Sequence, residues 1–363
     1  WIFALPHPAL DANCFSVVWT GSVVMPRTMD GCIGLSTQDS MRLYVDDKLL
    51  IDGWGKDKSA DQALDFHFEA GRTYKIRIEF VNDRRGARVI FGYSAGRENF
   101  PAAVEAARKA DVAILCMGDN EETSGENFDR TDLNLPGRQL ELVQAVYATG
   151  TPVVLVLQSG RPVTANWEND HLPAILEAWF PGEQGGTAIA KTLFGDAAPG
   201  GRLPITFPRS VGQIPCHYSR RPGGGKRYVE MDWLPLYPFG YGLTYTTFAY
   251  RDMALSRSVI DPQDTVTVSV TVTNTGKYTG DAVPQLYVRD MFSSVVKPER
   301  QLAAFRRLTL APGESRRVEL TVGPKQLRTL GPDYVWRVEP GKFELQLGDN
   351  AENILLRADL TVE

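Results

Sequence analysis

The sequence predicts a multidomain protein in which an incomplete α/β domain lies between two all-β regions. Polar and apolar residues alternate with period two near both ends of the chain, which is typical of half-buried strands. In the middle, continuous apolar runs alternate with helical patterns, which indicates a mostly parallel sheet. A chain of 363 residues has room for two or three domains, at roughly 100–200 residues each.

The first region, residues 1–97, is predicted to be an all-β sandwich. Residues 15–20 are β-branched and aromatic, and residues 42–46 and 74–80 alternate in polarity. No helix-period segment of useful length interrupts them. A sandwich therefore fits this region better than a mixed fold.

The second region, residues 98–220, is predicted to be an α/β domain. Helices are expected at 102–110, 137–148 and 185–194, and apolar strands at 112–117, 152–157 and 174–179. Strands of this kind are expected in a parallel sheet covered on both faces. Only about three strand–helix units are present, so the sheet is expected to lack its N-terminal strands.

Residues 221–247 form a connector, and residues 248–363 a second β-sandwich. The connector is rich in aromatic residues, which argues against a flexible linker. Beyond it, strict alternation over residues 265–273 and three later strand patterns, each after a turn, predict about seven strands.

Composition narrows the classes of partner. The net charge of −5 disfavours nucleic acid, and no run approaches the roughly 18 apolar residues of a membrane span. The four cysteines form no CxxC pair, and no cofactor or metal site is expected. Cys116, inside an apolar run, is expected to be a buried thiol, whereas the sequence leaves open whether Cys14 and Cys32 pair.

The loop after the first apolar strand holds most of the chemical signal. It follows the carboxyl end of a predicted parallel strand, where open α/β sheets bind ligands. Gly118 and Gly125 permit sharp turns. Thirteen positions contain six ionisable residues, namely Asp119, Glu121, Glu122, Glu126, Asp129 and Arg130. From composition alone, a solvated acidic loop remains open; the spacing does not match an EF-hand calcium loop.

Several motifs, in order along the chain, resemble glycoside hydrolase family 3. The first is Ser124-Gly-Glu-Asn-Phe-Asp-Arg130, followed by Leu133-Asn-Leu-Pro-Gly137 and a helix. The others are Trp179-Phe-Pro-Gly-Glu-Gln-Gly-Gly186, Gly201-Arg-Leu-Pro-Ile-Thr-Phe-Pro208 and Tyr237-Pro-Phe-Gly-Tyr-Gly-Leu243. Residues 1–97 are similar to a partial protective-antigen-type β-sandwich, residues 98–220 to a partial α/β sandwich domain, and residues 248–363 to a fibronectin type III-like domain.

The resemblance implies that Glu126 is the general acid/base of a retaining β-glycosidase. Such an acid stays protonated until it donates to the leaving oxygen, which burial or a neighbouring carboxylate favours. Glu122 and Asp129 are weaker candidates for contacts to the substrate, the alternative being solvated side chains. Trp54 is a candidate for stacking on a sugar ring, with loop packing as the alternative.

The resemblance also implies what this chain does not supply. In the family, a preceding barrel carries an Asp nucleophile, and nothing in residues 1–97 resembles a barrel. Because the chain begins at Trp1 without a Met or a signal segment, we expect a fragment, a processed piece or one subunit of a split protein. The barrel part is then an expected partner, homo-oligomerisation is left open, and a periplasmic or secreted location is favoured over the cytoplasm.

The predicted function is that of an exo-acting β-glycosidase, with β-glucosidase favoured. β-Xylosidase or arabinofuranosidase activity is the near alternative, because the acid/base loop is similar in those relatives. A non-catalytic carbohydrate-binding module is the alternative from another class, since two β-sandwiches alone would suit it. In that case the loop that carries Glu126 would have no purpose.

Overall fold

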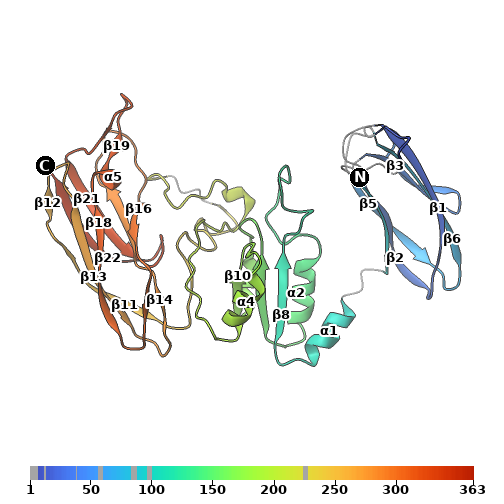
Figure 1. Ribbon diagram of the computed structural model, residues 1–363, viewed down its shortest axis with the longest axis horizontal. Helices are drawn as coiled ribbons and strands as arrows, with labels where there is room; N and C mark the ends of the chain where they lie inside the picture. The colour runs from blue at the N-terminus through green and yellow to red at the C-terminus, as the bar shows by residue number, and fades with distance from the viewer. Residues whose placement is uncertain are drawn as a thin grey trace. The chain divides into compact units, whose positions relative to one another are not determined.

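The computed structural model describes residues 7–11, 14–37, 39–55, 60–82, 88–95, 100–223 and 228–363. It divides the chain into two compact units, residues 1–101 and 102–363. Figure 1 shows both units with their helices and strands labelled. Among the described residues, no helix has the length and apolar character needed to cross a membrane.

The first unit is built from two antiparallel sheets, with strand orders β1-β6-β3-β4 and β5-β2-β7. Apolar side chains at alternate positions form its core, for example Ile33 and Leu35 from one sheet and Leu43, Ile76 and Ile78 from the other. The strands are β1 (Phe15–Val24), β2 (Met29–Thr37), β3 (Ser40–Val45), β4 (Lys48–Asp52), β5 (Ala60–Phe68), β6 (Thr73–Asn82) and β7 (Val89–Ala95).

Glycines explain why β2 and β7 of this unit were not predicted from the sequence. β2 contains Gly31 and Gly34, and β7 contains Gly92, so glycine interrupts the alternation. In the structure β2 lies between β5 and β7, and a Cβ atom at Gly34 would lie 2.4 Å from the carbonyl oxygen of Gln62. The glycine therefore serves the close approach of neighbouring strands. Cys14 and Cys32 are both free thiols here.

In the second unit, three parallel strands form a sheet with the order β10-β9-β8. The α/β elements are α1 (Pro101–Arg108), β8 (Ala113–Gly118), α2 (Gln139–Tyr147), β9 (Val153–Gln158), α3 (Asn166–His171), β10 (Ala174–Glu177) and α4 (Gly185–Leu193). Val143 and Val146 of α2 join Ala113, Leu155 and Leu157 in one buried cluster. The predicted mostly parallel sheet is confirmed.

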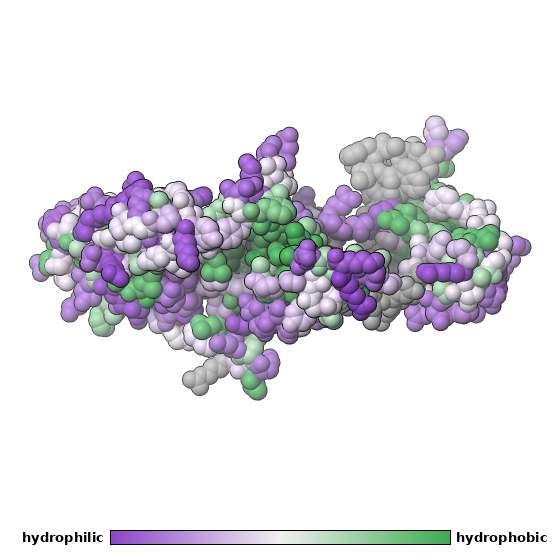
Figure 2. Space-filling model, turned by 90° about the horizontal axis from the view of Figure 1, so that it is seen from below, coloured by the Kyte–Doolittle hydropathy of each residue, from purple (hydrophilic) through white to green (hydrophobic). Residues whose placement is uncertain are grey.

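The prediction that this sheet is covered on both faces is wrong at β8. Ala113 is buried on the packed side, whereas Ile114 is 42% exposed and Cys116 is exposed on the other side. Cys116 is therefore not the buried thiol that its apolar run predicted. The physical reason is that side chains alternate between the two faces of a strand, and the described residues cover only the face of β8 that carries Ala113. Figure 2 shows hydrophobic residues gathered over the middle of the face that it presents.

The described part of the connector, residues 221–223 and 228–247, pairs with the segment before it, which contains a short helix η1 (Val211–Gln213). Phe207 pairs with Tyr237, and Leu203 with Tyr241 and Gly240. The side chain of Gln285 in the following sandwich donates hydrogen bonds to the carbonyls of Gly240 (3.0 Å) and Asp349 (2.6 Å). The connector is thus fixed to the C-terminal sandwich.

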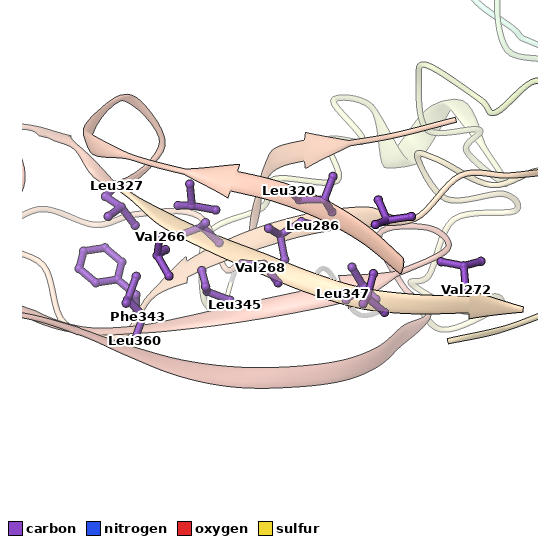
Figure 3. Close-up of a cluster of buried hydrophobic side chains, with 14 of the residues drawn as sticks. Val266, Val268, Val272, Leu286, Leu320, Leu327, Phe343, Leu345, Leu347 and Leu360 are labelled. Atoms are coloured by element: carbon purple, nitrogen blue, oxygen red, sulfur yellow. The ribbon is translucent and has the colours of Figure 1, made fainter. Parts of the chain in front are cut away.

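That sandwich contains two main sheets, with strand orders β11-β13-β18 and β12-β22-β21-β15-β16. Val266, Val268, Val270 and Val272 of β13 are fully buried and pack among the labelled leucines of Figure 3. The elements are β11 (Phe248–Leu255), β12 (Val259–Ile260), β13 (Val266–Asn274), β14 (Gly280–Ala282), β15 (Gln285–Asp290), β16 (Gln301–Phe305), β17 (Leu308–Leu310), β18 (Ser315–Val322), α5 (Pro324–Leu327), β19 (Thr329–Leu330), β20 (Trp336–Arg337), β21 (Gly341–Gly348) and β22 (Ile354–Val362). The fold class predicted from sequence is confirmed.

Candidate active site

The carboxyl ends of the three parallel strands lie at one edge of the sheet. The segment after β8 covers residues 119–130, the segment after β9 begins at Ser159, and the segment after β10 begins at Ala178. This is the edge where open α/β sheets bind ligands. The acidic loop singled out by the sequence is therefore at the expected place, and we call residues 119–130 the acid/base loop.

Gly118 fixes the start of the acid/base loop. Its φ is +141°, and a Cβ atom there would lie 2.0 Å from the carbonyl oxygen of Gln158 on β9, so only glycine fits. The side-chain amide of Gln139, at the start of α2, accepts from the Gly118 N–H (2.7 Å) and donates to its carbonyl (2.8 Å). The N–H and the C=O of Gly118 thus both have a hydrogen-bond partner, and these two bonds hold the end of β8 against the start of α2.

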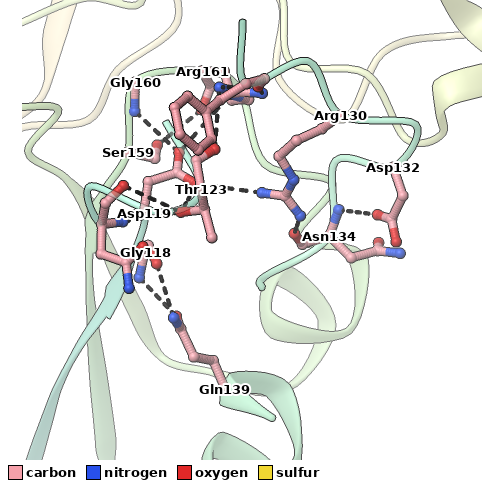
Figure 4. A network of polar contacts seen from close by, with 12 residues as sticks. Gly118, Asp119, Thr123, Arg130, Asp132, Asn134, Gln139, Ser159, Gly160 and Arg161 are labelled. Atoms are coloured by element: carbon pink, nitrogen blue, oxygen red, sulfur yellow. Dashed lines mark hydrogen bonds and ion pairs between the residues drawn. The ribbon is translucent and has the colours of Figure 1, made fainter. Parts of the chain in front are cut away.

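Asp119 is the centre of a polar network beneath the loop (Figure 4). Its side chain is only 1% exposed. One carboxylate oxygen accepts from the Thr123 hydroxyl (3.0 Å) and from Arg130 (3.3 Å). The other accepts from the N–H of Gly160 (3.3 Å) and lies 4.0 Å from the Arg161 guanidinium. Two cations and an N–H group thus compensate a carboxylate that would be costly to bury alone.

Arg161 also binds the backbone of the acid/base loop. Its guanidinium donates to the carbonyl of Phe128 (3.3 Å) and to the carbonyl of Thr123 (3.4 Å). These two contacts lie on either side of residues 124–127. The segment between them is held at its ends rather than along its length.

Glu126 lies within that segment, and its side chain is exposed. Asn127 has a positive φ of 65°, and Gly125 packs close to the ring of Phe128. The network therefore fixes the base of the loop and leaves the carboxyl of Glu126 facing solvent. A general acid is favoured by burial or by a neighbouring carboxylate. The described residues do not bury Glu126.

The other predicted site residues fall in two places. Glu122 and Asp129 lie in the same loop as Glu126 and are exposed. Trp54 belongs to the first unit, where it is 39% exposed, and the Arg42 guanidinium lies 4.6 Å from the centre of its ring. One face of the indole is thus engaged by a cation. Among the described residues, no group of three or more His, Cys, Asp or Glu side chains is arranged to hold a metal ion.

Comparison with known proteins bears on the segment that contains this site. Residues 19–245 match the glycosyl hydrolase family 3 C-terminal domain. The chain belongs to glycosyl hydrolase family 3. Residues 282–351 of this family 3 chain also match the fibronectin type III-like domain.

Relatives with known names agree with this membership. The chain is 45% identical over 302 residues to a β-xylosidase of Formosa agariphila, covering 80% of this chain and 42% of that protein. It is 42% identical over 263 residues to a periplasmic β-glucosidase of Salmonella typhimurium, covering 69% and 34%. The structure of a Kluyveromyces marxianus β-glucosidase in complex with glucose matches with a TM-score of 0.73 and 28% identity, covering 100% of this chain and 47% of that one. The family 3 chain spans less than half the length of these relatives.

One partly buried acidic residue of the family 3 chain was not predicted as a site residue. Glu177 is the last residue of β10, and burial raises the pKa of its carboxyl to about 7. A sequence signal for this residue exists, because Glu177 is an acidic side chain that ends an otherwise apolar strand, at the sheet edge where ligands are expected to bind. The apolar run predicts the strand but does not indicate that its last side chain is partly buried.

Proposed function

We propose that this chain supplies Glu126 as the general acid/base of an exo-acting retaining β-glycosidase that releases terminal non-reducing β-D-glucosyl residues. The observation that carries the proposal is the place of Glu126. It lies at the carboxyl edge of the parallel sheet, in a segment of a family 3 domain whose two ends are held by Arg161. Its carboxyl is exposed and available to a substrate.

Such a carboxyl can act twice in the reaction. Glu126 first donates its proton to the departing glycosidic oxygen, and the resulting carboxylate then takes a proton from water during hydrolysis of the glycosyl-enzyme intermediate. The segment 124–127 can move over a bound substrate while Thr123 and Phe128 stay fixed, which suits a step that needs water excluded. Glu122 and Asp129 are proposed as secondary contacts, and Trp54 as a sugar-stacking residue of the first unit.

The nucleophile is proposed to come from a part of the enzyme outside residues 1–363. Relatives are more than twice as long as the segment matched here, and a retaining mechanism needs a second carboxyl about 5–5.5 Å from the first. The open edge of β8 and its exposed Ile114 and Cys116 offer that part a place to pack. We propose residues 1–97, 98–220, 221–247 and 248–363 as the segments of this chain.

β-Xylosidase activity is the second candidate, because the Formosa agariphila relative that is 45% identical bears that name. Comparison of kcat/KM for the p-nitrophenyl β-glucoside, β-xyloside and α-arabinofuranoside decides between the sugars. A periplasmic or secreted location is proposed from the name of the Salmonella typhimurium relative.

The test of Glu126 uses the complete enzyme, with its N-terminal part included. Glu126→Ala should lower kcat at least about 100-fold for cellobiose, within the usual range for general acid catalysis. Glycosylation from an aryl glycoside with an acidic phenol should fall far less, because such a leaving group needs little protonation. Azide should restore turnover and give the β-glycosyl azide.

The matched control is Glu121→Ala, another exposed carboxyl of the same loop. It should retain wild-type turnover. If Glu126→Ala hydrolyses cellobiose at the wild-type rate, the assignment is wrong, and a carbohydrate-binding role for the chain gains support.

A further inference from the structure

Glu177 occupies the junction between the segments that follow β9 and β10. One oxygen of its carboxyl, Oε1, accepts from the backbone N–H of Trp179 (2.9 Å) and lies 3.4 Å from the hydroxyl of Ser159. The other oxygen, Oε2, is buried and has no hydrogen-bond partner among the described residues. These surroundings favour the neutral form of the Glu177 carboxyl, because an ionised oxygen without a hydrogen-bond partner is costly to bury.

The contact with Trp179 holds an unusual backbone conformation. Trp179 has a positive φ of 53°, which is uncommon for any residue but glycine and asparagine. Its N–H is directed to the carboxyl two residues earlier, so the side chain of Glu177 supports the turn that leaves β10. The following residue, Phe180, lies against Gly160, where a Cβ atom would meet its ring at 2.8 Å.

The contact with Ser159 leads to the acid/base loop. The Ser159 hydroxyl donates to the carbonyl of Arg161 (2.8 Å), and Arg161 in turn binds the carbonyls of Phe128 and Thr123. A Cβ atom at Gly160 would also lie 2.8 Å from the hydroxyl oxygen of Ser124. The turn of residues 159–161 is therefore packed between Glu177 on one side and the acid/base loop on the other.

We propose that Glu177 is a positioning residue for the general acid/base: its carboxyl holds the turns after β9 and β10 together and so fixes Arg161, which binds the loop on both sides of Glu126. This inference rests on the proposed role of Glu126. Glu177 itself contacts neither Glu126 nor, by this argument, the substrate. It acts through the geometry of the backbone carbonyls that Arg161 binds.

The charges around Glu177 give this role a dependence on pH. Burial and, to a smaller extent, the negative charge of Asp119 raise the pKa of Glu177 to about 7, whereas the hydrogen bonds from Trp179 and Ser159 act in the opposite direction. The guanidinium groups of Arg161 and Arg130 are engaged by the carboxylate of Asp119. Neutral Glu177 keeps the junction closed. Ionised Glu177 is a largely desolvated charge, and because this cost exceeds the gain from the Trp179 and Ser159 hydrogen bonds, ionisation loosens the turn that carries Arg161.

The experiment compares Glu177→Gln and Glu177→Ala in the complete enzyme. Glutamine keeps an oxygen for the Trp179 N–H and cannot ionise, so kcat near pH 6 should stay within about 2-fold of the wild type. Its activity should fall less than that of the wild type as the pH rises above 7. Glu177→Ala removes the carboxyl that joins the turns after β9 and β10. For this variant kcat for cellobiose should fall at least about 10-fold, with KM changed far less.

Hydrogen exchange supplies a readout that does not depend on activity. The amides of residues 119–130 should exchange faster in Glu177→Ala and at the wild-type rate in Glu177→Gln at pH 6. The matched control is Glu168→Gln, which alters another buried carboxyl of the same domain, on α3, whose pKa burial also raises. It should leave exchange in the loop and the pH profile of activity unchanged.

The outcomes separate this inference from the proposed function. Loss of activity in Glu126→Ala together with wild-type exchange and kcat in Glu177→Ala would overturn the positioning role alone. Full activity in Glu126→Ala would overturn the proposed function, and with it the inference. Equal losses in Glu177→Gln and Glu177→Ala would also count against it, because the amide should restore the junction.

Discussion

The C-terminal sandwich and the α/β sheet use similar apolar strands with different results. In the sandwich, the valines of β13 are all fully buried between two sheets. In the α/β sheet, β8 is an edge strand whose Ile114 and Cys116 are exposed. The comparison teaches that an apolar run predicts a strand, whereas the number of its covered faces depends on what the rest of the protein supplies.

The largest expected effect comes from removing a core side chain of the sandwich. Phe343 is 1% exposed, and Phe343→Ala should lower the free energy of unfolding by about 3–5 kcal/mol. Phe292→Ala is the control, since Phe292 is 81% exposed, and its effect should lie within about 0.5 kcal/mol. Urea unfolding checks both. Similar midpoints for the two variants would contradict the view that this sandwich has a complete core.

A smaller effect is expected from the charge of Glu177 in the α/β domain. Because burial raises its pKa from 4.5 to about 7, the stabilisation due to its neutral form is complete below about pH 4.5 and is lost as the pH rises through about 7. Glu177→Gln cannot ionise, so its stability relative to the wild type should increase over that window, by up to about 3 kcal/mol.

Urea midpoints from pH 4 to 8.5 measure this difference. Glu121→Gln, which alters an exposed carboxyl of the acid/base loop, should follow the wild type at every pH. A constant difference between Glu177→Gln and the wild type over this range would show that the pKa of Glu177 is the same in the folded and the unfolded protein, which contradicts the prediction.

The smallest effect tests the open face of β8 through its thiol. In the isolated chain, Cys116 should react with a thiol reagent about as fast as Cys14, since both are exposed. In the complete enzyme, the rate at Cys116 should fall about 10-fold or more, because the proposed N-terminal part covers that face. Cys14 serves as the internal control, measured in single-cysteine variants. Unchanged labelling of Cys116 would mean that the face stays open.

Local pattern was enough to find the strands of the two sandwiches with the clearest alternation, such as β6 and β13, and the three parallel strands between them. It did not find β11 or β22 of the C-terminal sandwich. It failed at β2 and β7, where glycines break the alternation, and at the short helix α3. It also failed for Cys116, because an apolar run does not reveal how many faces of its strand are covered. The acid/base loop was found because a motif and a strand end coincide there.

The sequence by itself determined the family, the order of the segments and the proposal of Glu126, since each of these depends on residues that are close together in the chain. Only the tertiary structure revealed how the loop is held. Asp119 meets Arg161 across 42 positions, and Ser159 meets Glu177 across 18. Whether a carboxyl is buried, and which cation or N–H group compensates it, depends on chain segments brought together by the sheet. The polar network at the carboxyl edge of β8, β9 and β10 therefore follows from the fold and not from any local pattern.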